Sequence, residues 1–578
     1  MRDYKWINTI QLQKTWEQMH LAYERQARRI WIVNVGDLKP LELPISHFMD
    51  MAYDISLYGP DSVLSWLESW AAREFGADAA AETARIMSNY SMAAGRRKYE
   101  LIDASTYSLI NYNEADRVLA QWEAMASAAE SVMESLSLDA RDAFFEMVYH
   151  PVNAGYIFNN IMISTARNNL YAGQGRSNAN AIADLVRDLF EQDHALTVRY
   201  NTLLDGKWAH MMDQTHIGYK YWQQPMRQAL PGLQYVATQE RGLVGDMGVA
   251  IQGSNASIPG DDMYHDLSSN SLTMDPFDPY GVRTQWIDIF ATGTNVATNW
   301  NISANASWVS FSQDSGTLAG DGSTDAHVWV NIDWDNVPSD EPQQMVMVNV
   351  STAPNDTSLY TQQTQYGTQY SMPQLMLPIN NTRVADGFRN GFVESDGHIV
   401  IEAEHWSQPL NPSDNLSYEI LPSAGRTLSG VTLFPVTADS QTPDSGPGLE
   451  YNIYTFTPPS YVHALSANGK LNITLVLTTS LNTIPDRPLK YAMQLDDQEV
   501  QSVVYIEDQP EGANPKGWGE AVANNAWTST TRWEYAEAGE HRVRVWALEP
   551  GVVMTTIWVD FGGVRQSYLG PEESWRLE

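Results

Sequence analysis

The apolar positions of residues 1–54 predict three elements in a row. Leu12, Trp16 and Met19 recur at the spacing of a helix. Residues 29–35, RIWIVNV, form a short apolar run led by β-branched residues, which indicates a buried strand of the kind found in parallel sheets. Because helix, buried strand and polar loop form the repeating unit of an α/β fold, a single unit cannot bury its own strand. We therefore expect this strand to pack elsewhere in the chain or to close a (β/α) barrel whose other strands lie upstream.

The pattern between residues 55 and 235 is that of amphipathic helices. Residues 114–135 are rich in helix formers and place their apolar side chains in one stripe. Residues 139–170 and 177–204 continue in the same way. We expect a helical bundle domain over 55–235.

Beyond residue 240 the helix formers thin out, and Gly, Pro, Asn and Asp separate short apolar runs. Residues 327–334, HVWVNIDW, alternate between apolar and polar positions and predict a half-buried strand. We expect one β-sandwich over 240–375 and a second, jelly-roll-like antiparallel sandwich over 397–578, with 351–395 crossing between them. The predicted fold class is therefore multidomain α + β: the end of a (β/α) barrel, a helical bundle and two antiparallel β-sandwich regions.

The composition of the chain argues against several classes of binding partner and cofactor. The chain has 578 residues, a formal net charge of −35 and no cysteine. Such an acidic chain is a poor binder of nucleic acid or of an anionic membrane, because both require basic patches. Without cysteine there is no disulfide, thiol chemistry or cysteine metal site. No apolar run is long enough to span a membrane.

Two features of the sequence bear on whether the protein is secreted. The segment MRDYKWINTI has no apolar core and does not resemble a signal peptide. Asn-x-Ser/Thr triplets crowd the second half and permit a glycosylated, secreted protein, although a chain rich in Asn, Ser and Thr makes such triplets by chance. We expect an extracellular location for the full-length parent.

Two loops carry candidate binding residues. Asn34, Asp37 and Lys39 follow the predicted strand, and polar residues at the carboxyl end of a parallel strand line the active face of an α/β barrel. The alternative is an ordinary strand-to-helix turn. The second loop, NNLYAGQGR, offers three further candidates or a plain helix–helix connection: Asn169, Tyr171 and Arg176, whose guanidinium suits a carboxylate.

A third stretch, residues 205–219, contains histidines at helical spacing. His210, Asp213 and His216 sit three apart and could share a face, which is a superficial likeness to a metal site. Hydrogen bonding to a substrate, with Tyr219 as a stacking surface, and structural burial are the alternatives.

A fourth constellation could hold calcium. Glu402 and Glu404 alternate along a predicted strand, and pairing with the last strand could bring Asp560 beside them. The IEAE pattern is similar to that of jelly-roll carbohydrate-binding modules, where it serves a structural calcium. The alternative is a solvated strand face. No cofactor is otherwise required.

Several stretches together resemble glycoside hydrolase family 115, the xylan α-1,2-glucuronidases. In chain order they are YKWINTIQLQKTWEQM, WIVNVGDLKPLE, NNLYAGQGRSNANAIA, YNTLLDGKWAHMMDQTHIGYKYW, WVSFSQDSGTL and SYLGPEESW. The resemblance runs from residue 3 to the end of the chain.

The resemblance implies hydrolysis, with inversion, of α-1,2-linked glucuronic acid or its 4-O-methyl ether from glucuronoxylan or a xylo-oligosaccharide. It also implies that the catalytic barrel lies mostly upstream, so that the chain itself lacks the catalytic carboxylates, with Asp37 as a weak candidate. The residues carried over as substrate-pocket candidates are Asn34, Asp37, Lys39, Asn169, Tyr171, Arg176, His210, His216 and Tyr219.

One hypothesis of another class stays open at this point. The chain could be a non-catalytic carbohydrate-binding protein made of a helical domain and two sandwiches. The sequence is also compatible with a homodimer.

Overall fold

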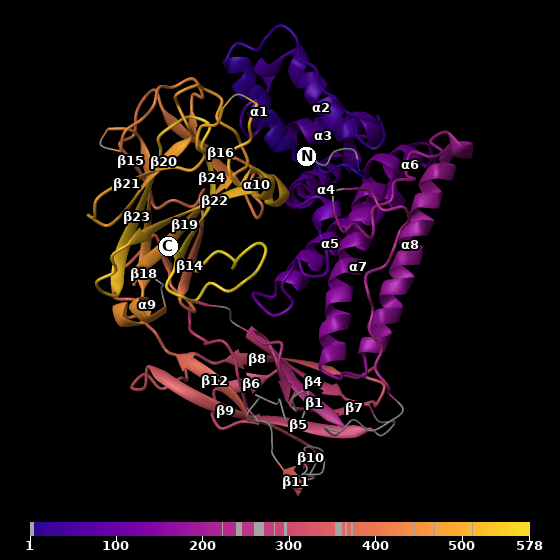
Figure 1. Ribbon diagram of the computed structural model, residues 1–578, viewed down its shortest axis with the longest axis vertical. Coiled ribbons are helices and arrows are strands. Elements are labelled where there is room, and N and C mark those ends of the chain that lie inside the picture. The colour runs from indigo at the N-terminus through magenta and orange to yellow at the C-terminus, as the bar shows by residue number, and fades with distance from the viewer. Residues whose placement is uncertain are drawn as a thin grey trace.

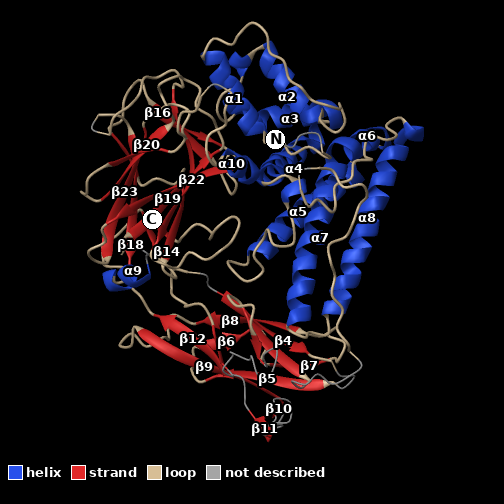
Figure 2. Cartoon of the chain, viewed as in Figure 1, coloured by secondary structure: helices blue, strands red, loops and turns tan. Residues whose placement is uncertain are grey.

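The computed structural model describes most of the chain, and the following account covers those residues alone: 5–221, 223–238, 246–258, 271–281, 284–293, 297–352, 361–364, 367–370, 374–443, 445–465, 469–510 and 512–578. Helices fill the first part of the chain and strands the rest (Figures 1 and 2). The predicted order of a helical bundle and two β-sandwich regions is thereby confirmed.

The helical region begins with α1 and ends with α8. Its helices are α1 (Leu12–Glu24), α2 (Glu42–Tyr53), α3 (Ser62–Phe75), α4 (Ala77–Arg96), α5 (Glu114–Ser135), α6 (Leu138–Phe144), α7 (His150–Gly173) and α8 (Ala179–Gly206), with a π-helical turn at Phe145–Tyr149. Helix α5 has the predicted bounds, and its apolar stripe, including Val118, Trp122 and Met125, is buried. Within the described residues, none of the helices has the length and apolar content needed to cross a membrane.

The first sandwich consists of two packed sheets. Their strand orders are β2-β1-β4-β8-β6 and β3-β12-β9-β5-β7. The strands are β1 (Met247–Ile251), β2 (Ser257–Ile258), β3 (Ser271–Thr273), β4 (Thr284–Ala291), β5 (Thr298–Ala304), β6 (Val309–Phe311), β7 (Ser315–Leu318), β8 (Ala326–Ile332), β9 (Gln343–Thr352) and β12 (Gln374–Asn380), and β10 (Thr361–Thr364) pairs with β11 (Gly367–Tyr370). The predicted strand at 327–334 corresponds to β8, whose Val328 and Val330 are fully buried. The pairing is antiparallel except between β12 and β3.

The second sandwich also has two sheets, ordered β21-β20-β23-β18-β13-β25 and β16-β17-β24-β19-β22. Its strands are β13 (Gly391–Val393), β14 (His398–Glu402), β15 (Gln408–Leu410), β16 (Ser417–Leu421), β17 (Gly430–Phe434), β18 (Gly448–Thr455), β19 (Leu471–Thr478), β20 (Lys490–Leu495), β21 (Gln501–Val504), β22 (Ala526–Trp533), β23 (Gly539–Ala547), β24 (Val553–Asp560) and β25 (Arg576–Leu577), with short helices α9 (Pro459–Leu465) and α10 (Trp518–Asn524). The four predicted domain ranges stay predictions.

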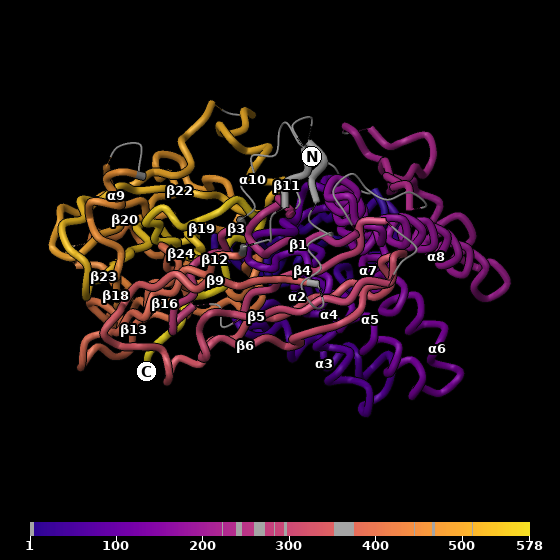
Figure 3. The backbone as a smooth tube through the Cα atoms, turned by 90° about the horizontal axis from the view of Figure 1, so that it is seen from below, coloured from indigo at the N-terminus to yellow at the C-terminus, as the bar shows by residue number. Residues whose placement is uncertain are grey.

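The three regions pack against one another. The second sandwich lies beside the helical region, and the first sandwich lies across the lower ends of both, as the view from below shows (Figures 1 and 3). The amide of Ser177, before α8, donates to the carbonyl of Ala291 on β4 at 2.8 Å. The amide of Gly253 donates to the carbonyl of Ile110, in the loop before α5, at 2.9 Å. Backbone hydrogen bonds therefore join the first sandwich to the helical region at two places.

The predicted strand at residues 29–35 is wrong. The segment has no regular secondary structure, and Ile30 and Ile32 are 78% and 88% exposed. A parallel strand needs neighbouring strands for its hydrogen bonds and helices to cover its faces. Every sheet in the described residues is built from β1 onward, so this apolar run has no strand beside it.

The loop that follows this segment is held by one lysine. The Nζ atom of Lys39 contacts the carboxylates of both Glu42 on α2 and Glu146 in the π-helical turn, and lies 4.0 Å from the centre of the Trp208 ring. Burial, followed by the adjacent Glu146, raises the pKa of Glu42 to about 8. Lys39 therefore attaches the loop to the bundle through two carboxyl groups, one on α2 and one in the π-helical turn.

A second buried carboxylate, that of Glu114, joins the helical region to the second sandwich. Glu114, the first residue of α5, is completely buried. It accepts hydrogen bonds from the backbone amides of Ser108 (2.7 Å), Tyr568 (3.0 Å) and Leu569 (2.5 Å). Hydrogen bonds to a charged acceptor are stronger than neutral ones, and all three amides would be left unpaired without it.

We predict that Glu114→Ala lowers the free energy of unfolding by roughly 3 kcal/mol or more, because one buried and two partly buried amides lose their acceptor. Urea unfolding followed by circular dichroism measures this. The matched control is Glu123→Ala, an exposed position on the same helix, which should change stability by less than about 0.5 kcal/mol. Equal effects of the two substitutions would contradict the role given to Glu114.

The second prediction concerns pH. The pKa of Glu42 is about 8 in the folded chain, above its ordinary value of 4.5, so the folded state holds this proton more tightly. The stability from Glu42 is therefore full below about pH 4.5 and falls as pH rises to 8, by at most about 1.4 kcal/mol per pH unit. Glu42→Gln cannot ionise and should lose this part of the slope, as unfolding at about pH 5, 7 and 9 would show. Parallel stability–pH curves for the two proteins would refute the shared-lysine arrangement, and Glu123→Gln should follow wild type.

Candidate functional site

Side chains from the N-terminal segment, the loop before α2 and the turn after α4 enclose a pocket of about 250 Å³. We call it the Trp6 pocket. Its polar and aromatic lining residues are Lys5, Trp6, Asn8, Asn34, Asp37, Lys39, Lys98, Tyr99, Glu100 and Gln214. Three of the predicted site residues, Asn34, Asp37 and Lys39, thus lie together, and they meet residues that are distant in sequence.

The indole of Trp6 is fixed by a histidine behind it. Its ring stacks on that of His216, with centroids 3.7 Å apart and planes at 4°. The side-chain oxygen of Gln228 accepts from the amides of His216 (3.1 Å) and Ile217 (2.7 Å). Nδ1 of His216 lies 2.9 Å from both Nε2 of Gln228 and the carbonyl oxygen of Gln214. The other ring nitrogen, Nε2, lies 2.9 Å from Oδ1 of Asp193. His216 acts on the pocket by positioning Trp6, and Nε1 of Trp6 has no hydrogen-bond partner among the described residues.

Three lysines and two carboxylic residues line the Trp6 pocket. Lys39, which the sequence suggested as a partner for a substrate carboxylate, already contacts Glu42 and Glu146. Lys5 and Lys98 are the other cations in the lining, and Asp37 and Glu100 are its carboxylates. A lysine shared by two carboxylates is a weaker anchor for a third, because its charge is already balanced.

The NNLYAGQGR loop lies elsewhere, at the joint between the helical region and the first sandwich. Arg176 is buried and its Nη1 lies 2.6 Å from Oδ2 of Asp288 on β4. The same guanidinium lies 3.9 Å from the centre of the Tyr171 ring, while Asn169 accepts from Gln234. Burial alone would raise the pKa of Asp288, but Arg176 and His327 outweigh it and lower that pKa. Arg176 does bind a carboxylate, as its chemistry suggested, but that carboxylate belongs to the chain.

The predicted histidine pair does not share a face. The His210 side chain is 87% exposed, and its Nδ1 lies 2.6 Å from Asp213, whereas His216 is buried against Asp193. The reading of His210, Asp213 and His216 as one metal site is therefore wrong. Tyr219 is half-buried and is not part of the Trp6 pocket lining.

The register of the second sandwich separates the predicted calcium ligands. Strands β14 and β24 do pair, but Asp560 lies opposite His398, while Glu402 lies opposite Thr556. Four residues of strand correspond to about 13 Å, so Glu402, Glu404 and Asp560 cannot bind one ion. Glu402 instead accepts from Thr427 at 2.6 Å, and burial raises its pKa to about 7. Among the described residues, no group of three or more His, Cys, Asp or Glu side chains is placed to hold a metal ion.

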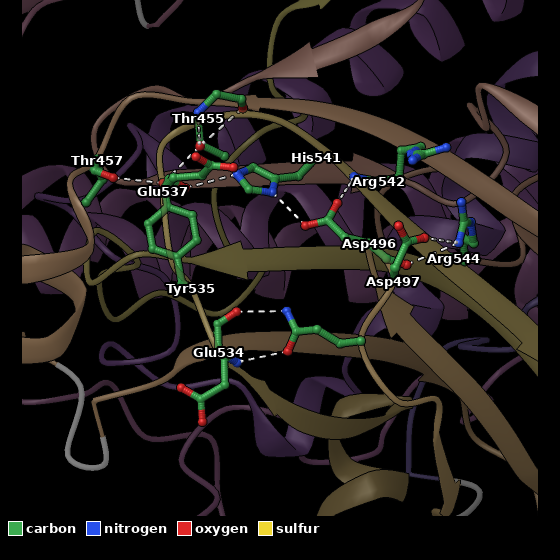
Figure 4. Close-up of polar contacts among 12 residues, drawn as sticks. Thr455, Thr457, Asp496, Asp497, Glu534, Tyr535, Glu537, His541, Arg542 and Arg544 are labelled. Carbon is green, nitrogen blue, oxygen red and sulfur yellow. Dashed lines mark hydrogen bonds and ion pairs between the residues drawn. The ribbon is translucent and has the colours of Figure 1, made fainter.

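A histidine–aspartate pair in the second sandwich was not predicted (Figure 4). The Nδ1 atom of His541 on β23 lies 2.8 Å from Oδ2 of Asp496, and Oδ1 of Asp496 accepts from the amide of Arg542 at 2.9 Å. Burial alone would lower the pKa of His541, but Asp496 outweighs it and raises that pKa. The contacts join the ends of two neighbouring strands, which indicates a structural role. Sequence spacing gave no signal for this pair, nor for Asp193, Gln228 or Glu100 around the Trp6 pocket.

Comparison with known proteins places both ends of the chain in one family. Residues 1–101 match the description "Glycosyl hydrolase family 115", and residues 391–573 match "Glycosyl hydrolase family 115 C-terminal domain". The first match covers most of the Trp6 pocket lining, and the second covers most of the second sandwich. Among curated proteins, none matches the chain.

A match among solved structures covers nearly the whole chain. It is a family GH115 4-O-methyl-α-glucuronidase, BtGH115A, described as specific for decorated arabinogalactans, at 15% identity and a TM-score of 0.50. The match covers 96% of this chain and 49% of that protein, so the chain spans about half the length of its solved relative.

Smaller matches involve carbohydrate-binding modules. They are the C-terminal family 6 module of LamC from Zobellia galactanivorans and a family 35 module from Clostridium thermocellum, each at 12% identity, over 28% of this chain and 98% and 97% of the modules. Their TM-scores of 0.18 are too low to support a shared fold. Both ends of the chain thus match models of glycoside hydrolase family 115, and the chain shares the fold of BtGH115A, a solved member of that family.

Proposed function

We propose that the chain is part of an α-glucuronidase that removes α-1,2-linked glucuronic acid, or its 4-O-methyl ether, from glucuronoxylan with inversion. The Trp6 pocket is the observation that carries this proposal. It combines an aromatic ring, amides and three lysines, Lys5, Lys39 and Lys98, at one place. A uronic acid offers hydroxyl groups to the amides and a carboxylate to a lysine. The parent enzyme is proposed to be extracellular.

The chemistry requires two carboxyl groups. In an inverting hydrolysis one carboxylic acid protonates the glycosidic oxygen as its bond to the anomeric carbon breaks, while a carboxylate takes a proton from the water that attacks the opposite face. The two groups stand roughly 6.5–9.5 Å apart to admit that water. Asp37 and Glu100 are the carboxylates of the described pocket lining. We propose that this chain binds the uronic acid but does not complete the acid–base pair, with Asp37 as the weak candidate for one member.

The binding prediction uses glucuronic acid and the chain as it stands. Calorimetric titration should show saturable binding, because the pocket offers donors to both the hydroxyls and the carboxylate. Asn34→Ala should weaken this binding by about tenfold, equal to about 1.4 kcal/mol, and added salt should weaken it further. Asp188→Asn, at an exposed position of α8, is the control and should bind as wild type does.

Release of the sugar from glucuronoxylan tests the catalytic half of the proposal. We expect binding without release at an enzymatic rate. Rapid release would place the acid and base on this chain, and Asp37→Asn would then be the first variant to assay. Binding of neutral xylan without any binding of glucuronic acid would instead favour a non-catalytic carbohydrate-binding protein.

A further inference from the structure

A second pocket lies where all three regions of the molecule meet. The loop after β24, which carries Arg565, lies at this junction (Figure 1). The pocket has a volume of about 530 Å³. The helical region contributes Tyr112, the first sandwich Gln252 and Gln285, and the second sandwich Asp396, Arg565 and Trp575. We call it the junction pocket, and none of the sequence-predicted site residues lines it.

Two glutamines in its wall have unsatisfied oxygens. Gln252 and Gln285 are 5% and 4% exposed, and the Oε1 atom of each has no hydrogen-bond partner among the described residues. The amide nitrogen of Gln285 is used, since it donates to the carbonyl of Asp275 at 3.0 Å. Buried amide oxygens are nearly always paired, so two unpaired acceptors beside one cavity point to a ligand that donates hydrogen bonds.

The charges of the pocket disfavour an anion. Arg565 is held by Asp275 at 3.0 Å and by both carboxylate oxygens of Asp396. The amide of Arg565 also donates to the hydroxyl oxygen of Tyr112 at 2.6 Å. Burial lowers the pKa of His398 to about 4, so this neighbour is neutral at pH 7. One arginine between two aspartates leaves no excess positive charge for a uronate or a phosphate.

The remaining charged groups of the lining are engaged with the protein. Arg576 donates to Oδ1 of Asn390 at 2.6 Å. Glu572 lies 3.3 Å from Arg117, and Glu573 lies 2.8 Å from His405. The pocket is therefore rich in acceptors and has a slight excess of carboxylates.

An aromatic surface completes the pocket. Trp575, in the segment before β25, is 44% exposed, whereas most other residues of the wall are half-buried. A half-exposed indole beside hydrogen-bonding groups suits a ligand with an apolar face and polar edges. A pyranose ring has this character, because its C–H groups form a face and its hydroxyls form the rim.

We propose that the junction pocket binds a neutral glycosyl unit of a polysaccharide, with Trp575 against the sugar face and Gln252 and Gln285 accepting from its hydroxyls. The ligand differs in charge from the uronic acid proposed for the Trp6 pocket, and the inference does not rest on that proposal. A bound metal ion is the competing occupant, since carboxylate and amide oxygens also bind hard cations.

The test is calorimetric titration of the whole chain with xylotriose, galactotriose, glucuronic acid and calcium chloride. We expect at least one neutral trisaccharide to bind, and Gln252→Leu and Trp575→Ala each to weaken that binding about tenfold or more. Gln252→Leu removes an unpaired buried acceptor, so its melting temperature should equal or exceed that of wild type, which separates lost binding from lost folding. Tyr461→Ala, at an exposed ring on α9, is the matched control and should bind as wild type does.

Three outcomes would overturn the inference. They are no binding of either neutral sugar, binding that both variants leave unchanged, and saturable heat with calcium or glucuronic acid alone that Gln252→Leu abolishes. Because Asn34→Ala reports on the Trp6 pocket, failure at one pocket is distinguishable from failure at the other.

Discussion

The arrangement of the three regions depends on the buried carboxylate of Glu114. Its three backbone partners belong to segments that start near residue 108 and residue 568, so one side chain fixes the entry of α5 and the loop of the second sandwich together. The same loop carries Arg565, whose guanidinium reaches Asp275 in the first sandwich. The Glu114 side chain is costly to remove, because it is completely buried and the amides that it satisfies are buried or partly buried. The junction pocket exists because this loop is held where three surfaces meet.

Positive charge is scarce in this chain, with 35 Lys and Arg against 70 Asp and Glu. Several cations are committed to internal carboxylates: Lys39 to two glutamates, Arg176 to Asp288 and Arg565 to two aspartates. The pairs of Arg176 and Arg565, and that of Lys39 with Glu146, join segments distant in sequence, so they serve the assembly of the molecule. An acidic sugar in the Trp6 pocket would meet the lysines of its lining, Lys5, Lys39 and Lys98. The junction pocket, whose two arginines are outnumbered by four carboxylic residues, suits a neutral ligand.

The family match and the fold agree with the resemblance found in the sequence, and the individual residues show its limits. Asn34, Asp37 and Lys39 do lie in one pocket with Trp6. His216 acts behind Trp6, through a ring stack that no spacing rule predicts. Arg176 has the predicted chemistry but an internal partner, and Asp560 has the predicted strand pairing but a register that separates it from Glu402. In each case the residue type was read correctly, while its partner was set by contacts between distant segments.

The sequence by itself determined the type of most elements, because amphipathic periodicity and turn residues are local properties. Residues 114–135 form a helix with those bounds, and the alternation at 327–334 gives a strand. Only the tertiary structure decided which elements acquire partners. The run at 29–35 has the composition of a buried strand, yet it lies exposed because strand formation requires hydrogen bonds from neighbouring strands. The full walls of the two pockets were likewise decided by the tertiary structure, since each wall combines segments distant in sequence that meet only in the folded chain, although three residues of the Trp6 pocket were predicted together.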